Sequence, residues 1–171
     1  MKWLFLFTKM NGIKIREVRR EDNLVLAQII RAAFIEFGAP LTGTVYEDPT
    51  TDALFELFET KKNAILFVAE DQGLVVGCCG IFPTNGLDNG YAELVKFYLA
   101  SEARGKKIGK TLFEKSIQAA RDFKYQFLYI ESQPSFSKAV QMYERYDFKY
   151  LNHSLGNSGH DNCDVWMLKN L

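Results

Sequence analysis

The stretch AELVKFYLASEARGKKIGKTLFEKSIQAARDFKYQFLYIE, residues 92–131, decides the fold of this chain. Residues 92–99 are apolar at both odd and even positions, which is typical of a strand covered on both faces. Residues 126–130 form a second apolar run that is short enough for a strand. Between the two runs, apolar side chains recur at the spacing of one helix face: Ile108, Leu112, Phe113, Ile117 and Ala120. The stretch therefore predicts a strand, a turn, a helix and a second strand.

The turn before this helix, RGKKIG at residues 104–109, is basic and contains two glycines. The first amides of a helix have no partner within the helix, and the helix dipole places about half a positive charge there. Four cations surround the turn: Arg104, Lys106, Lys107 and Lys110. A diphosphate would fit such a turn, but an ordinary solvated basic turn has the same residues. The sequence contains neither the pattern of a P-loop nor that of a dinucleotide site. The diphosphate site and the ordinary solvated turn therefore both stay open as interpretations of these residues.

The same residues resemble the acetyl-CoA-binding motif of the GCN5-related N-acetyltransferase (GNAT) family, Arg/Gln-x-x-Gly-x-Gly/Ala. Arg104 matches the first position and Gly109 the last, whereas Lys107 stands where a glycine is usual and crowds the turn. The resemblance extends over residues 14–171. It implies that the turn and the strand before it hold the cofactor acetyl-CoA, through Phe97, Tyr98, Leu99, Arg104, Gly105, Lys106, Lys107, Ile108, Gly109 and Lys110.

The rest of the chain supplies the other elements that this family's fold requires. Further strands are predicted at residues 13–18, 64–69, 74–82, 148–151 and 164–168, and further helices at 23–37, 51–59 and 136–145. Asp22 or Asn23 is expected to cap the first helix, and Gly38 to end it. We expect an α/β (α+β) fold in three layers, with a mixed, mostly antiparallel sheet, one parallel crossover and a splayed strand pair. This topology follows from the resemblance and not from the periodicity alone.

Composition limits the classes of protein that remain. A chain of 171 residues, 47% of them apolar, suits one N-acetyltransferase domain over residues 1–171. The 21 basic and 21 acidic residues balance, so we expect neither a nucleic-acid nor a membrane partner. The three cysteines show no disulfide or zinc spacing, which favours a reducing, cytoplasmic location. The apolar run within residues 1–10 is too short for the core of a signal peptide. We expect these residues to be a disordered extension, or translation to start at Met10.

Acetyl transfer from a thioester to an amine requires a base, because an alkylammonium has a pKa of about 10.4. Glu93 is the predicted base. Residues 93, 95, 97 and 99 are expected to share one face of the strand, so that Glu93 lies in line with the acetyl site. Burial would raise the pKa of Glu93 and suit it to this role. A strand-end glutamate in solvent or in a salt bridge is the alternative, and Glu131 is the second candidate base.

The remaining catalytic features come from the resemblance. It implies that a bulge splays the strand, so that the amides of Phe97 and Leu99 hold the pantetheine arm and the acetyl carbonyl. Residues 139–148 resemble the family's Ala-x-x-x-Tyr-Glu-x-x-Gly-Phe, which implies that Tyr143 protonates the leaving thiolate. A tyrosine in the core is the alternative. Asp147 replaces the usual glycine, and it can still adopt a left-handed turn.

The sequence gives weaker signals for the residues that would bind the amine acceptor. The loop at residues 38–49 contains Glu47 and Asp48, which would suit a cationic amine but are also ordinary for a solvated loop. His160 lies in a Gly/Ser/Asn-rich loop, so we expect a solvated histidine rather than an acceptor contact. Only two residues separate it from Cys163, and because two ligands do not make a metal site, we predict no metal.

The sequence thus supports two hypotheses. The first is an N-acetyltransferase that moves the acetyl group of acetyl-CoA to a primary amine of an unidentified small molecule or peptide. Transfer would be direct, in a ternary complex, because no cysteine is placed as an acyl carrier. The second hypothesis is a non-catalytic acyl-CoA-binding or sensing module on the same fold. A homodimer is compatible with the resemblance.

Overall fold

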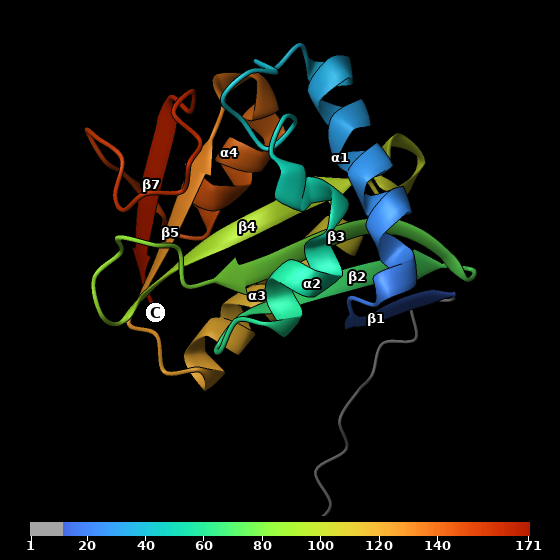
Figure 1. The fold of residues 1–171 in the computed structure, drawn as a ribbon, viewed down its shortest axis with the longest axis horizontal. Helices are drawn as coiled ribbons and strands as arrows, with labels where there is room; N and C mark the ends of the chain where they lie inside the picture. Colours follow the sequence, from blue (N-terminus) through green and yellow to red (C-terminus); the bar gives the residue numbers. More distant parts are fainter. Residues whose placement is uncertain (1–11) are drawn as a thin grey trace, which may run out of the picture.

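One seven-stranded sheet forms the centre of the computed structural model, which describes residues 12–171 (Figure 1). Its strands are β1 (Ile13–Glu17), β2 (Ile65–Asp71), β3 (Leu74–Phe82), β4 (Tyr91–Leu99), β5 (Phe127–Ser132), β6 (Lys149–Tyr150) and β7 (Val165–Asn170). Their spatial order is β1-β2-β3-β4-β5-β7-β6. Every neighbouring pair is antiparallel except β4 and β5, which are parallel. The predicted mixed sheet with one parallel crossover is confirmed. The predictions for residues 1–10 lie outside the described residues.

Helices cover both faces of this sheet and complete the three layers. They are α1 (Asn23–Phe37), α2 (Leu54–Glu59), α3 (Ile108–Asp122) and α4 (Ser137–Arg145), with short 3-10 helices at Arg20–Asp22, Pro49–Asp52, Ser101–Ala103 and Pro134–Phe136. One apolar cluster joins α1 and α2 to the sheet, and a second joins α3 and α4 to the opposite face. Among residues 12–171, none of the helices has the length and apolar character that crossing a bilayer requires.

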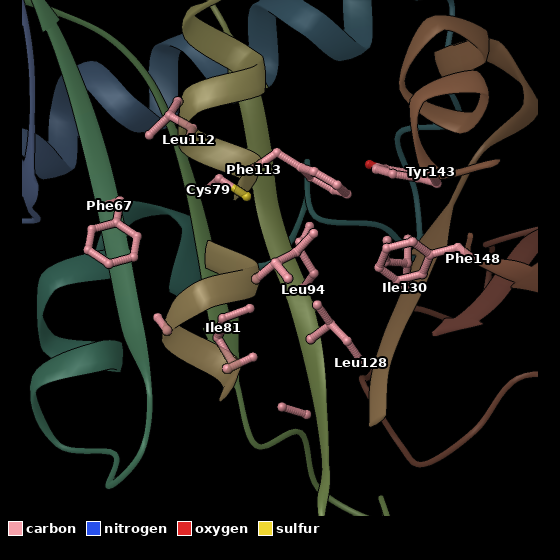
Figure 2. Close-up of a cluster of buried hydrophobic side chains, with 14 of the residues drawn as sticks. Phe67, Cys79, Ile81, Leu94, Leu112, Phe113, Leu128, Ile130, Tyr143 and Phe148 are labelled. Atoms are coloured by element: carbon pink, nitrogen blue, oxygen red, sulfur yellow. The ribbon is translucent and has the colours of Figure 1, made fainter. Parts of the chain in front are cut away.

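Helix α3 forms where the sequence predicts it, and its apolar face is buried against the sheet. The predicted stripe of Ile108, Leu112, Phe113, Ile117 and Ala120 is buried throughout. Figure 2 shows Phe113 extending from the helix toward Tyr143 of α4. Because α3 follows β4 and precedes β5, its packing fixes the two parallel strands side by side.

The ends of α1 show one correct and one wrong prediction. Gly38 ends the helix in the left-handed conformation, with φ 62°, which a residue without a Cβ adopts at little cost. Asp22 stands at the N-cap, but its side chain makes no cap hydrogen bond to α1. Instead it accepts hydrogen bonds from the Arg16 guanidinium at 2.7 and 2.8 Å and from the Arg19 amide. An ion pair in the interior thus takes precedence over the local cap.

Other departures are small and follow from tertiary contacts. The helix predicted at residues 51–59 is split into a 3-10 turn and α2, because Ala53 leaves helical geometry with ψ 46°. Only Leu54 and Phe58 of α2 are buried. The sixth strand shrinks to two residues, Lys149–Tyr150, because it pairs with β7 only there.

A bulge in β4 reverses the side-chain alternation of that strand. Cys78 faces Tyr98 and Gly80 faces Val95, so a single residue of β3 opposes both Lys96 and Phe97. Lys96 takes a left-handed conformation, with φ 55°. One extra residue moves every later side chain to the other face. Val95 therefore packs with α1 and α2, whereas Phe97 and Leu99 pack with α3. The prediction that residues 93, 95, 97 and 99 share one face is wrong for this reason.

Just before the bulge, after Glu93, β4 and β5 separate. Their parallel pairing is limited to Tyr91, Ala92 and Glu93 on β4. Figure 1 shows the two strands meeting near their starts and diverging toward α4. The predicted splayed strand pair is thus confirmed, and past Glu93 no residue of β4 pairs with β5.

Candidate active site

The opening between the splayed strands leads to a cavity of about 450 Å³. Residues 93–98 of β4 form one wall, and the residues that end β5 form another. The loop that precedes α2 and the loop between β6 and β7 close it, although they are far apart in the sequence. Elements from both layers of helices also contribute, so the cavity depends on the whole fold.

Glu93 lies on the wall of this cavity with only 5% of its surface exposed. The Thr84 hydroxyl donates a hydrogen bond of 2.5 Å to its carboxylate. The pKa of Glu93 is raised to about 8, mainly by burial and in addition by the charge of Glu131, while Thr84 and Lys96 oppose the rise. The residue is therefore neither a solvated strand-end glutamate nor a partner in a close salt bridge. It is a carboxyl group that titrates near neutral pH inside a cavity, as a general base requires.

Glu131, the second candidate base, lines the same cavity. Its two oxygens are both occupied, since the Tyr129 hydroxyl donates at 2.9 Å and the Ser158 hydroxyl at 2.6 Å. Both oxygens of Glu131 therefore already accept a hydrogen bond from within the chain. Its charge also helps to hold the proton on Glu93.

Lys96, the bulged residue, is a cavity residue that the sequence analysis missed. It is 8% exposed, and its Nζ lies 3.9 Å from Asp48 Oδ2, which is too far for a hydrogen bond. Burial lowers the pKa of Lys96, and Asp48 and Glu93 oppose that change. The signal was visible: a lysine stands in the middle of an apolar strand.

Asp48 and His160 meet across the mouth of the cavity. His160 Nε2 lies 3.0 Å from Asp48 Oδ2, and the imidazole is 14% exposed. The hydrogen bond from His160, together with those from Thr50, holds the pKa of Asp48 well below its usual range. The expectation of a solvated histidine is therefore wrong. Nothing local could reveal this pair, because 112 residues separate its members.

Tyr143 reaches the cavity from α4, with 5% of its surface exposed. Its ring stacks on Phe113 at 5.7 Å between centroids, and Figure 2 shows its hydroxyl pointing from α4 toward β4. Within residues 12–171 that hydroxyl makes no hydrogen bond. Burial raises the pKa of Tyr143. The core and the catalytic interpretations of this residue are compatible, because the ring packs in the core while the hydroxyl faces open space.

The side chains of the basic turn are largely engaged with carboxylates. Arg104 donates to Glu36 at 2.6 and 2.9 Å and lies over the Phe37 ring at 4.8 Å. Lys106 pairs with Asp71 at 3.2 Å. Lys110 has a similar, longer contact within α3. The Glu36 and Glu114 side chains are exposed and that of Asp71 is 20% exposed, so water screens these pairs and a phosphate can replace the carboxylate at small cost.

The backbone of the turn is better prepared for an anion than its side chains. Lys107 is the N-cap of α3, in a left-handed conformation with φ 64°, and no side chain caps the helix. The first amides of α3 are thus without a helical partner. A Cβ on Gly109 would lie 2.9 Å from Leu99 Cδ1, so any larger residue where α3 begins against β4 requires the Leu99 side chain to shift. Lys107 adopts the conformation that the usual glycine would take, and its side chain is exposed.

No group of three His, Cys, Asp or Glu residues in the described part of the chain is arranged to hold a metal ion. The prediction of no metal stays a prediction.

Comparison with known proteins connects this geometry to a family. A profile of the Acetyltransferase (GNAT) family matches residues 27–148. The N-acetyltransferase YjgM of Escherichia coli strain K12, itself uncharacterized, is 32% identical over 158 residues, which cover 92% of this chain and 94% of that protein. A crystal structure of an acetyltransferase from Streptococcus agalactiae is 18% identical, with a TM-score of 0.80 over 94% of this chain and 99% of that chain. The structure of yncA from Salmonella typhimurium, with its cofactor acetyl-CoA, has a TM-score of 0.74 at 17% identity over 94% of each chain.

Proposed function

Since the chain belongs to the GNAT acetyltransferase family, we propose that it transfers the acetyl group of acetyl-CoA directly to a primary amine in a ternary complex. It is a GNAT-type N-acetyltransferase. The observation that carries the proposal is the cavity between the splayed strands, where Glu93, with a pKa near 8, and Tyr143 both reach the same space. We further propose that residues 1–171 act as one catalytic domain. A non-catalytic module is set aside, because the family profile and the curated relative are both acetyltransferases.

The cofactor would bind along β4 and the turn that follows it. The uncapped N-terminus of α3 would take the pyrophosphate through the amides of residues 108–110. Arg104 and Lys106 would exchange their surface carboxylate partners for phosphate oxygens. Because β5 leaves β4 after Glu93, the backbone of Phe97, Tyr98 and Leu99 is open to the pantetheine arm. The acetyl-CoA in yncA supports this assignment through the shared fold.

The chemistry then requires one proton acceptor and one proton donor. The neutral amine attacks the thioester carbonyl, so a C–N bond forms and the C–S bond breaks. The ionised Glu93 takes the proton that the amine nitrogen loses. Tyr143 gives its proton to the departing thiolate, which leaves as the CoA thiol, and solvent returns the proton to the phenolate. The Asp48–His160 pair is a second candidate base, favoured by its 3.0 Å contact at the mouth of the cavity.

The first test measures thiol release from acetyl-CoA with a panel of primary amines. We expect release that depends on an added amine, and a loss of about a hundredfold or more in kcat for Tyr143→Phe, the range of general acid catalysis. Tyr146→Phe, at the C-cap of α4 and with its hydroxyl bonded to Glu114, is the matched control and should retain activity. Release that does not depend on the amine, or equal rates in the two variants, would contradict the proposal.

A second variant separates loss of binding from loss of chemistry. Gly109→Glu would force a side chain against Leu99 and place a negative charge at the N-terminus of α3. We expect it to abolish the rise in melting temperature that CoA gives the wild type. Tyr143→Phe should keep that rise while losing turnover.

A further inference from the structure

The ammonium of Lys96 is the one feature of the cavity that the proposed reaction does not use. Three N–H groups sit on a nearly buried Nζ, and within residues 12–171 none of them makes a hydrogen bond. Its nearest ion-pair partner, Asp48 Oδ2, is 3.9 Å away. Burial of a charged group without hydrogen bonds costs free energy, and a ligand that accepts hydrogen bonds from Lys96 would offset that cost.

The neighbouring carboxylates are already committed to other donors. Asp48 accepts from the Thr50 amide at 2.8 Å and the Thr50 hydroxyl at 2.7 Å, in addition to its contact with His160. Glu93 accepts from Thr84. Both can therefore attract Lys96 through space, but neither satisfies its donors.

The backbone conformation at the bulge places the ammonium of Lys96 within the site. The bulge holds Lys96 at φ 55°, a conformation that costs free energy for any residue with a Cβ. It also puts Lys96 directly before Phe97, whose amide we assign to the cofactor. An acceptor that reaches the thioester must therefore pass close to the lysine.

We infer that the amine acceptor also carries a carboxylate, which Lys96 binds while the amine faces the base, so that the substrates are amino-acid-like. This inference rests on the proposed function and names its substrate class. A carboxylate has one charge, which matches a single ammonium. A phosphate dianion has twice that charge, so the negative charge of Asp48 in the same cavity opposes it more strongly than it opposes a carboxylate. The aromatic walls formed by Phe58 and Phe82 suit an apolar side chain on such a substrate.

The test compares each amino acid with its own carboxamide, which keeps the amine and the side chain but removes the negative charge. Phenylalanine, leucine and their amides are the probes, and kcat/KM is measured on wild type, Lys96→Met and Lys96→Arg. We expect the wild type to prefer the carboxylate by roughly tenfold to a hundredfold, the scale of one hydrogen bond between charged groups. Lys96→Met should lose that preference through a higher KM for the acids. Lys96→Arg should retain part of it.

Controls separate this inference from the proposed function. Lys149→Met, an exposed lysine on β6, should behave as the wild type does. The rise in melting temperature is also measured for each probe with CoA-saturated protein, which needs no turnover. A larger rise with the acids than with the amides, lost in Lys96→Met, supports the inference even if no acetylation occurs. An absence of acetylation would refute the proposed function without refuting this inference.

Three results would overturn the inference. One is equal use and equal binding of acids and amides by the wild type. The second is an equal loss of turnover on both classes of probe in Lys96→Met, since Lys96 would then act on the thioester. A failure of every probe to bind would likewise overturn it.

Discussion

Protonation of a single side chain, Glu93, couples the proposed reaction to pH. The base form of Glu93 becomes the major form only above its pKa of about 8, and its fraction grows with pH below that value, so kcat/KM of the wild type should rise as pH increases toward it. We expect Glu93→Gln to lose activity by about a hundredfold or more and to lose this rise. His160→Asn is the comparison, and a pH profile that vanishes in that variant alone would assign the base to the Asp48–His160 pair.

The same proton affects stability in a direction that can be measured without substrate. Burial makes the folded chain hold the Glu93 proton up to a pH of about 8, whereas the unfolded chain releases it near its ordinary pKa. The folded state thus binds more protons between these values, and its stability falls as pH rises through that interval. Glu93→Gln cannot ionise. The melting temperature of Glu93→Gln minus that of the wild type should therefore increase from pH 5 to pH 8. A constant difference would mean that Glu93 is ionised in the fold.

At the scale of elements, the turn before α3 contains a strained backbone conformation that one substitution should relieve. Lys107 holds φ 64°, where a lysine costs about 1 kcal/mol more than a glycine. Lys107→Gly should therefore raise the melting temperature by about 2–4 °C. Lys106→Gly is the matched control, because Lys106 does not have a positive φ and its ion pair with Asp71 would be lost. A rise in both variants, or in neither, would contradict this reading of the turn.

Element by element, the parts predicted well are those with local signals. The stripe of α3 and the glycine after α1 specify their structures through residues a few positions apart. The bulge in β4 has no such signal, since it arises from the register between β3 and β4. Alternation along β4 alone therefore placed Glu93 and Phe97 on one face, and the structure separates them.

For the whole molecule, sequence reasoning predicted a cofactor side of the proposed site and missed much of the proposed acceptor side. The turn at residues 104–109 is one continuous motif, and a motif can be recognised. The acceptor side is assembled from Asp48, Lys96 and His160, which only the completed sheet brings together. Residues that meet through tertiary structure leave no pattern of spacing in a single sequence.

The place of β7 in the sheet has a consequence for synthesis on the ribosome. β7, the last strand to be made, lies between β5 and β6, and the loop that carries His160 immediately precedes it. A nascent chain can therefore complete the cofactor turn long before its acceptor pocket exists. A chain released before Val165–Asn170 would leave β5 and β6 without their common neighbour. Termination of synthesis before Val165 should thus yield a product that chaperones and proteases recognise as unfinished, rather than an enzyme with altered selectivity.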